Sequence, residues 1–151
     1  KDIIGYTPLH LASDKGYIEV VKYLIEQCHA NVEARDIIEY TPLHIASDKG
    51  NIEVVEYLIE QCHANVEVKD NEGRTPLHLA SDKGNIEFVK YLIEQHHANV
   101  EAKGNKGSTP LHYASNNGHI EVVKYLIEQC HANVEAKNNN GNTLLHQKME
   151  Q

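Results

Sequence analysis

The chain of 151 residues has a net charge of −8, with 40% apolar and 24% charged residues. This composition is typical of a globular domain and argues against wholesale disorder. The acidic balance disfavours binding to nucleic acid or to anionic membranes, which needs clustered Lys and Arg. No run approaches about 20 apolar residues, so membrane insertion is not expected. Three cysteines, an odd number, make no disulfide framework and favour a reducing, intracellular compartment, which we take to be the cytoplasm.

A repeat organises the whole sequence. Threonines at positions 7, 41, 75, 109 and 143 lie 34 residues apart, and such a period indicates a solenoid. No initiator Met is present and the first residues already follow the pattern, which predicts a processed product or an excised segment. We expect a single domain with units at 2–35, 36–69, 70–103 and 104–137 and a partial unit at 138–151.

Each unit contains the signals for two helices, and the first unit shows them in chain order. Thr7-Pro8 starts a helix, since the Thr hydroxyl can cap free N–H groups and Pro has no N–H to lose. Gly16 ends it about eight residues later. A second helix, with apolar residues three and four apart, is expected over 18–27. An extended stretch at 31–34 leads into an Asp-x-x-Gly turn in the next hairpin. Neither helix can bury its apolar side alone, so neighbouring units must stack.

The third unit carries the pattern most completely. It reads Asp70-x-x-Gly73-x-Thr75-Pro76-Leu77-His78-x-Ala80, then Gly84-Asn85-Ile86-Glu87 and Tyr91-Leu92-Ile93-Glu94. This pattern resembles the ankyrin repeat, and the resemblance covers essentially the whole chain. It implies an all-α repeat solenoid: an elongated, gently curved stack of helix-turn-helix units with projecting hairpins. It also implies that each Thr-Pro-Leu-His histidine bonds to the Thr hydroxyl and to the backbone of the neighbouring unit. The structural residues so implied are Thr7, His10, Thr41, His44, Thr75, His78, Thr109 and His112.

The chain departs from this family in three ways. The period is 34 rather than the family's usual 33, and the extra residue falls in Gln-Cys-His. His29 and its equivalents His63, His97 and His131 replace a glycine, so a positive φ is expected at each or at the residue before it. Glu39 replaces the turn glycine of the second hairpin, which should cost roughly 1 kcal/mol if the left-handed conformation is kept.

Repeated Cys-His pairs raise the alternative of a metal or thiol sensor based on Cys28, Cys62 and Cys130. Zinc needs four ligands at about 2.0–2.3 Å from one ion. Equivalent side chains on stacked helices lie about 8–10 Å apart, and adjacent Cys and His cannot easily reach one point. Neither a metal ion nor another cofactor is therefore predicted.

Catalysis is not expected either. Ser13, Ser47 and Ser81 stand beside aspartates but recur identically in each unit, whereas an active site is usually singular. No phosphate-binding glycine loop is present. Glutamates also recur in columns, such as Glu26, Glu60 and Glu94, which we interpret as a solvated face that a basic partner could use.

The units differ at the hairpin tips and at the end of the first helix. In ankyrin repeats these positions line the concave, partner-binding side. The tips of the first two units carry large apolar residues in places that favour Asn, Asp and Gly, which predicts an exposed contact patch. The candidate partner-binding residues are Ile3, Ile4, Tyr6, Asp14, Lys15, Ile37, Ile38, Tyr40, Asp48, Lys49, Asn71, Glu72, Arg74, Asp82 and Lys83.

The predicted function is non-catalytic binding of a protein partner, with no small-molecule substrate. Two alternatives stay open. The near identity of the units is also typical of a structural spacer, or of an engineered or recently duplicated array without an evolved partner. The other alternative is the thiol or metal sensor. A preceding repeat that covers part of the apolar tips is a further interpretation of the patch.

Overall fold

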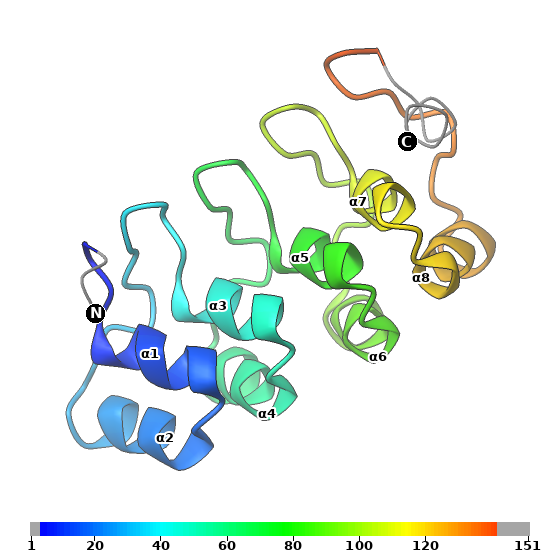
Figure 1. Ribbon diagram of the computed structural model, residues 1–151. Helices are drawn as coiled ribbons and strands as arrows, with labels where there is room; N and C mark the ends of the chain where they lie inside the picture. Colours follow the sequence, from blue (N-terminus) through cyan, green and yellow to red (C-terminus); the bar gives the residue numbers. More distant parts are fainter. Residues whose placement is uncertain (1–3, 142–151) are drawn as a thin grey trace.

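A computed structural model describes residues 4–141, and it is a stack of helix pairs joined by projecting loops (Figure 1). In the described residues there are helices and turns but no strand. The all-α repeat stack expected from the sequence is confirmed. The first helices are α1 (Pro8–Lys15), α3 (Pro42–Lys49), α5 (Pro76–Lys83) and α7 (Pro110–Asn116). The second helices are α2 (Ile18–Glu26), α4 (Ile52–Glu56), α6 (Ile86–Lys90) and α8 (Ile120–Lys124).

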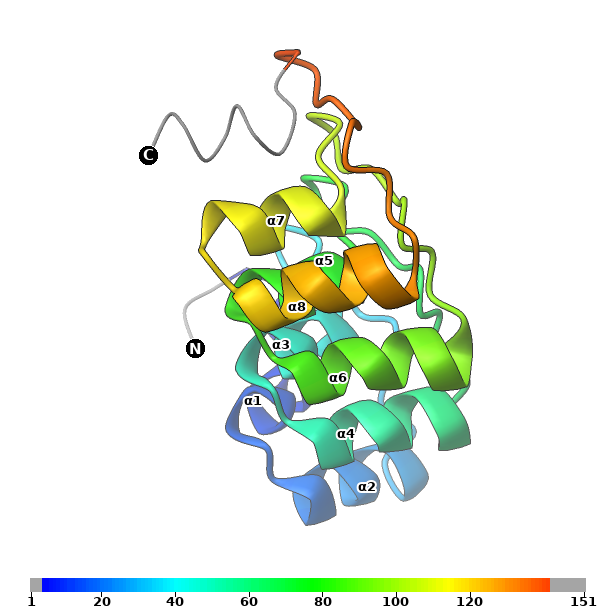
Figure 2. The ribbon, with the colours of Figure 1, turned by 90° about the vertical axis from the view of Figure 1, so that its right-hand side faces the viewer.

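The helices form two rows. The first helices lie in the row next to the loops, and the second helices form a nearly parallel row behind them (Figures 1 and 2). Thr7 caps α1 by accepting a hydrogen bond from the backbone N–H of His10, and Pro8 occupies the first helical position. Gly16 ends the helix with φ 75°. The start and end signals predicted for the first helix are therefore both present.

The second helices end in a wider turn than an α-helix. In units two to four the α-helix continues as a π-helix, namely η1 (Tyr57–Gln61), η2 (Tyr91–Gln95) and η3 (Tyr125–Gln129). The backbone N–H of Cys62 donates to the carbonyl of Tyr57, five residues earlier, at 3.3 Å. A π-turn accommodates one residue more than an α-turn. The extra residue in Gln-Cys-His is absorbed there without breaking the stack.

A histidine terminates each second helix, as predicted. His29, His63, His97 and His131 have φ values of 59°, 58°, 55° and 58°. The left-handed conformation reverses the chain after the helix, which is the role that glycine usually fills. The next residue then bonds back to the helix, as in Ala64 N–H to the Leu58 carbonyl at 2.9 Å.

The loops are ordered by side chains at their base and by their neighbours. Asp36 Oδ1 accepts hydrogen bonds from the N–H groups of Ile38 and Tyr40, at 3.0 and 2.9 Å. Asn71 N–H donates to the Ile38 carbonyl of the preceding loop at 3.1 Å. Successive loops are thus tied tip to tip, which fixes their spacing as well as that of the helices.

Glu39 occupies a left-handed position in the second loop, with φ 65°, where the third loop has Gly73 with φ 78°. Replacing Glu39 by Gly should raise the free energy of unfolding by roughly 1 kcal/mol, because Gly adopts this conformation without strain. Urea titration followed by circular dichroism measures the change. The matched control is Gly73→Ala, whose Cβ would lie 2.7 Å from the backbone N of Asn105 and should destabilise. An unchanged stability in Glu39→Gly would contradict the assignment of strain.

The core lies between successive helix pairs. Val54, Phe88 and Val122 occupy the same place in units two, three and four, and each is fully buried. Leu58, Leu92 and Leu126 are also fully buried at the start of the second-helix extension. Each unit therefore completes its apolar core only through its neighbours, as stacking requires.

Candidate protein-binding surface

The four Thr-Pro-Leu-His motifs make the same local contacts between the threonine and the histidine. In each unit His Nδ1 accepts the backbone N–H of the capping Thr, at 3.0 Å for Thr7 and His10 and 3.0 Å for Thr75 and His78. In the first three units the other ring nitrogen also contacts a carbonyl of the next unit, namely Tyr40 O for His10, Arg74 O for His44 and Ser108 O for His78. Thr41 with His44 and Thr109 with His112 repeat the local arrangement. These residues brace neighbouring units.

The neutral imidazole is the form that this geometry requires. A backbone N–H can only donate, so His78 Nδ1 must be unprotonated and Nε2–H donates to Ser108 O at 3.0 Å. Burial lowers the pKa of His78 to about 4 and also lowers the pKa of His44. These histidines are structural parts of the stack and are inaccessible to a partner.

The hairpin tips of the first two units carry exposed isoleucines. Ile4, Ile37 and Ile38 are 71%, 60% and 42% exposed. Ile3, the remaining member of the predicted set, lies outside the described residues. Such side chains in loops contribute little to the core, and their exposure leaves them available for contact.

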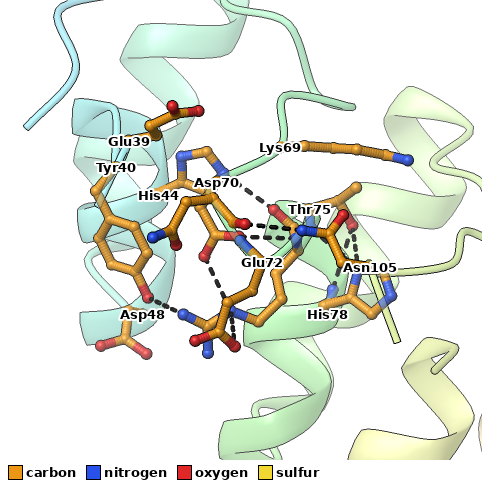
Figure 3. Close-up of polar contacts among 12 residues, drawn as sticks. Glu39, Tyr40, His44, Asp48, Lys69, Asp70, Glu72, Thr75, His78 and Asn105 are labelled. Atoms are coloured by element: carbon orange, nitrogen blue, oxygen red, sulfur yellow. Dashed lines mark hydrogen bonds and ion pairs between the residues drawn. The ribbon is translucent and has the colours of Figure 1, made fainter. Parts of the chain in front are cut away.

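The two tip tyrosines, Tyr6 and Tyr40, are only partly exposed. Tyr6 stacks on His10 and Tyr40 stacks on His44, with ring centroids 5.3 and 5.2 Å apart. Arg74 reaches Tyr40 from the third unit, with its Nη2 3.3 Å from the hydroxyl (Figure 3). Burial raises the pKa of Tyr40 to about 12. The tyrosine rings therefore support the loops while leaving an edge at the surface.

The third tip is polar. Arg74 Nε donates to the buried carboxylate of Asp70 at 2.9 Å (Figure 3). Asn71 and Glu72 are exposed on the same loop. The apolar character of the tips is thus confined to the first two units, and the surface changes from apolar to polar along the stack.

The adjacent Asp and Lys residues of the predicted partner-binding set form a ladder of ion pairs between successive units. Lys49 Nζ lies 3.3 Å from Asp14, and Lys83 Nζ lies 3.7 Å from Asp48. Asp82 accepts a hydrogen bond from Asn117 Nδ2 at 2.6 Å. The lysines remain exposed and the aspartates half-buried. Exposed pairs of this kind contribute about 0–1 kcal/mol, so they leave the charges usable by a partner.

A second ladder runs along the back of the stack. The hydroxyls of Tyr57, Tyr91 and Tyr125 donate to Glu26, Glu60 and Glu94 of the preceding unit, at 2.6, 2.6 and 2.7 Å. From the sequence we interpreted this glutamate column as a solvated face, and that interpretation did not include these hydrogen bonds. Burial and the bond to glutamate raise the pKa of each tyrosine. The signal in the sequence that could have indicated these bonds is that Tyr recurs at one position of the unit and Glu at another.

The cysteines lie beside this second ladder. Cys28 is exposed, and Cys62 and Cys130 are half-buried. Burial raises the pKa of Cys62 and Cys130, whereas reactive thiols need a lowered pKa. Across residues 4–141 no group of three or more metal-ligating side chains comes together.

Comparison with known families decides the classification. The model for the ankyrin repeat matches residues 4–37 and 106–139, and the model for three ankyrin repeats matches residues 33–104. The chain belongs to the ankyrin repeat family. Ankyrin repeats generally act as protein–protein interaction modules and are typically non-catalytic. A comparison with curated proteins returned no match. Within the described part of this ankyrin array, no helix has the length and apolarity to span a membrane.

Proposed function

We propose that this ankyrin array binds a protein partner without catalysis, through its hairpin tips and the adjoining row of first helices. The observation that carries the proposal is the exposure of Ile4, Ile37 and Ile38, in loops whose equivalents in the third and fourth units have polar residues at these positions. Buried isoleucines contribute about 1.5–3 kcal/mol each, so three of them can anchor an interface. The neighbouring Asp-Lys pairs and the polar third tip supply the rim that such interfaces usually have.

The two tip tyrosines favour contact at this place. Tyrosine is enriched at binding hot spots because it presents a large rigid surface. Tyr6 and Tyr40 are held by stacking on buried histidines, so they lose little freedom on binding. The predicted occupant is a protein segment with apolar side chains that fit between the first two tips.

The triple change of Ile4, Ile37 and Ile38 to Ser tests the proposal. Partner capture from cell extract by the immobilised chain should fall at least about tenfold, since each buried isoleucine contributes more than about 1.4 kcal/mol. The matched control changes Ile120 and Val134, exposed by 56% and 40% away from these tips, to Ser and should leave capture intact. Circular dichroism should be unchanged in both. Undiminished capture by the triple variant would contradict the proposal, and no specific capture by the parent chain would favour the spacer alternative.

A further inference from the structure

The fourth unit differs from the third at three positions that lie close together where the two units meet. At equivalent positions of the repeat, Ser108 replaces Arg74, Tyr113 replaces Leu79 and Asn117 replaces Lys83. A large cation becomes a small hydroxyl, an aliphatic side chain becomes aromatic, and a lysine becomes a neutral amide. Together these changes alter the shape and the charge of the surface between α5 and α7.

A hollow of about 220 Å³ opens between the third and fourth units. Its lining consists of Asp82, Ser108, His112, Tyr113 and Asn116. Ser108 is short and leaves space there. Arg74, at the equivalent position of the third unit, instead lies over the ring of Tyr40, with its guanidinium carbon 5.8 Å from the ring centroid. A water molecule takes up about 30 Å³ of liquid, so the hollow has room for the head group of a long side chain.

Tyr113 gives the hollow an aromatic wall that is held in place. The ring is half-buried and packs against the ring of His78, with centroids 5.1 Å apart and an angle of 65° between the planes. Since the ring is fixed before a partner arrives, little conformational freedom is lost on binding. An aromatic ring attracts a cation placed over its face within about 6 Å. Tyr113 therefore favours a cationic occupant.

The carboxylate of Asp82 lacks the ion pair that its equivalents make. Lys49 and Lys83 each pair with the aspartate one unit earlier, at 3.3 and 3.7 Å. At Asp82 the lysine is replaced by Asn117, whose amide donates to Oδ1 at 2.6 Å. Among residues 4–141 no ion pair to Asp82 is formed. The amide satisfies one oxygen without cancelling the charge, so the hollow keeps a negative group on its wall.

The charges that act on Tyr113 are mostly negative. Burial raises the pKa of Tyr113, the carboxylates of Glu72, Asp70 and Asp82 raise it further, and the guanidinium of Arg74 lowers it. That guanidinium is already shared, since Arg74 Nε lies 2.9 Å from Asp70 and 3.8 Å from Glu72. Three carboxylates against one cation leave an excess of negative charge beside the ring that lines the hollow.

We propose that this hollow binds an arginine side chain of the protein partner, with its guanidinium between the carboxylate of Asp82 and the ring of Tyr113. The inference rests on the proposed function, because the arginine belongs to the same partner. A guanidinium is planar, pairs with a carboxylate through two N–H groups and stacks on aromatic rings, whereas an ammonium group is compact and more strongly hydrated. The array uses the same combination internally, where Arg74 bonds to Asp70 and lies over Tyr40 (Figure 3).

Binding of N-acetyl-arginine methylamide to the 151-residue chain tests the proposal. In NMR titrations this probe should shift the ring signals of Tyr113 and the carboxyl signal of Asp82 in a saturable way. Asp82→Asn should weaken its binding at least about tenfold, as loss of a hydrogen bond to a charged group does. The corresponding lysine probe should bind more weakly than the arginine probe, because an ammonium cannot form the planar two-point contact.

Two further variants give the fourth unit what other units have. Asn117→Lys should form the missing ion pair with Asp82, and Ser108→Tyr should fill the hollow. Each should also weaken binding of the arginine probe at least about tenfold, since the first occupies the carboxylate and the second the space. The matched control is Glu121→Gln, which removes an exposed carboxylate of the fourth unit on α8 and should leave binding unchanged. Circular dichroism checks that all variants fold.

Absence of saturable binding by the parent chain would overturn the proposal. So would undiminished binding by Asp82→Asn or Asn117→Lys, or equally tight binding of the lysine probe. The probe does not involve the isoleucine tips, so the triple change of Ile4, Ile37 and Ile38 to Ser should bind it as tightly as the parent chain does. Undiminished partner capture by that triple variant would therefore contradict the isoleucine contact alone, whereas failure of the probe experiment would refute the arginine site alone.

Discussion

Phe88→Ala is expected to lower the free energy of unfolding by roughly 3–5 kcal/mol, the range for deleting a buried aromatic side chain. Phe88 is fully buried between the second and third helix pairs. The change removes contacts on both sides of an interface between units. It should therefore weaken the coupling between neighbouring units as well as the packing within one unit. Urea unfolding followed by far-ultraviolet circular dichroism measures the loss.

Equivalent valines supply the matched comparison. Val54→Ala should cost about 2 kcal/mol, because the side chain is fully buried. Val20→Ala, at the same place in the first unit, should stay within about 0.5 kcal/mol because the side chain is half exposed. Equal losses at the two positions would show that the face of α2 that carries Val20 is covered in solution, contrary to the structure.

Acidification is expected to destabilise the chain through His78. The pKa of His78 is lowered to about 4 in the fold, against about 6.5 for an unfolded chain. Between these values the unfolded state binds more protons, so stability rises with pH. The stabilisation that neutral His78 gives to the folded state is complete above about pH 6.5, and it is lost as the pH falls through about 4. A shift of this size corresponds to roughly 3 kcal/mol, and the lowered pKa of His44 adds in the same direction.

Unfolding free energies at about pH 7 and about pH 4 measure this effect in the parent chain and in His78→Gln. Glutamine at this position can still accept from the capping Thr75 N–H, but it does not titrate. The loss on acidification should therefore be smaller in His78→Gln by roughly 3 kcal/mol. The control His131→Asn removes an exposed histidine at a left-handed position that Asn tolerates, and should leave the pH dependence unchanged. A His78 ring that titrates near its ordinary pKa of about 6.5 in the folded protein, seen by NMR, would contradict the prediction.

The repeat architecture could be predicted from the sequence because its signals are local. Thr-Pro at 7–8 and Gly16 fix the ends of α1 through capping and a left-handed terminus. His29 stands at the place of a glycine, which predicts a positive φ, and the value of 59° confirms it. Such signals depend on a few neighbouring residues, so one chain segment carries all the information needed.

The contacts between units could not be predicted in the same way. Glu26 and Tyr57 are 31 residues apart, and nothing in either segment states that their side chains meet. Their distance depends on the π-turn and on the rotation of one helix pair against the next. The same holds for Lys49 and Asp14, which the sequence marked only as candidate partner-binding residues and which form an ion pair between units in the structure.

The sequence by itself determined the unit, its caps, its left-handed histidines and the all-α stack, because these follow from local conformational preferences repeated every 34 residues. Tertiary structure alone decided which equivalent residues differ in environment. Val20 and Val54 stand in nearly identical segments, yet one is half exposed and the other fully buried. Burial depends on whether a neighbouring helix pair lies against that face. The packing between units decides this, and the local sequence does not.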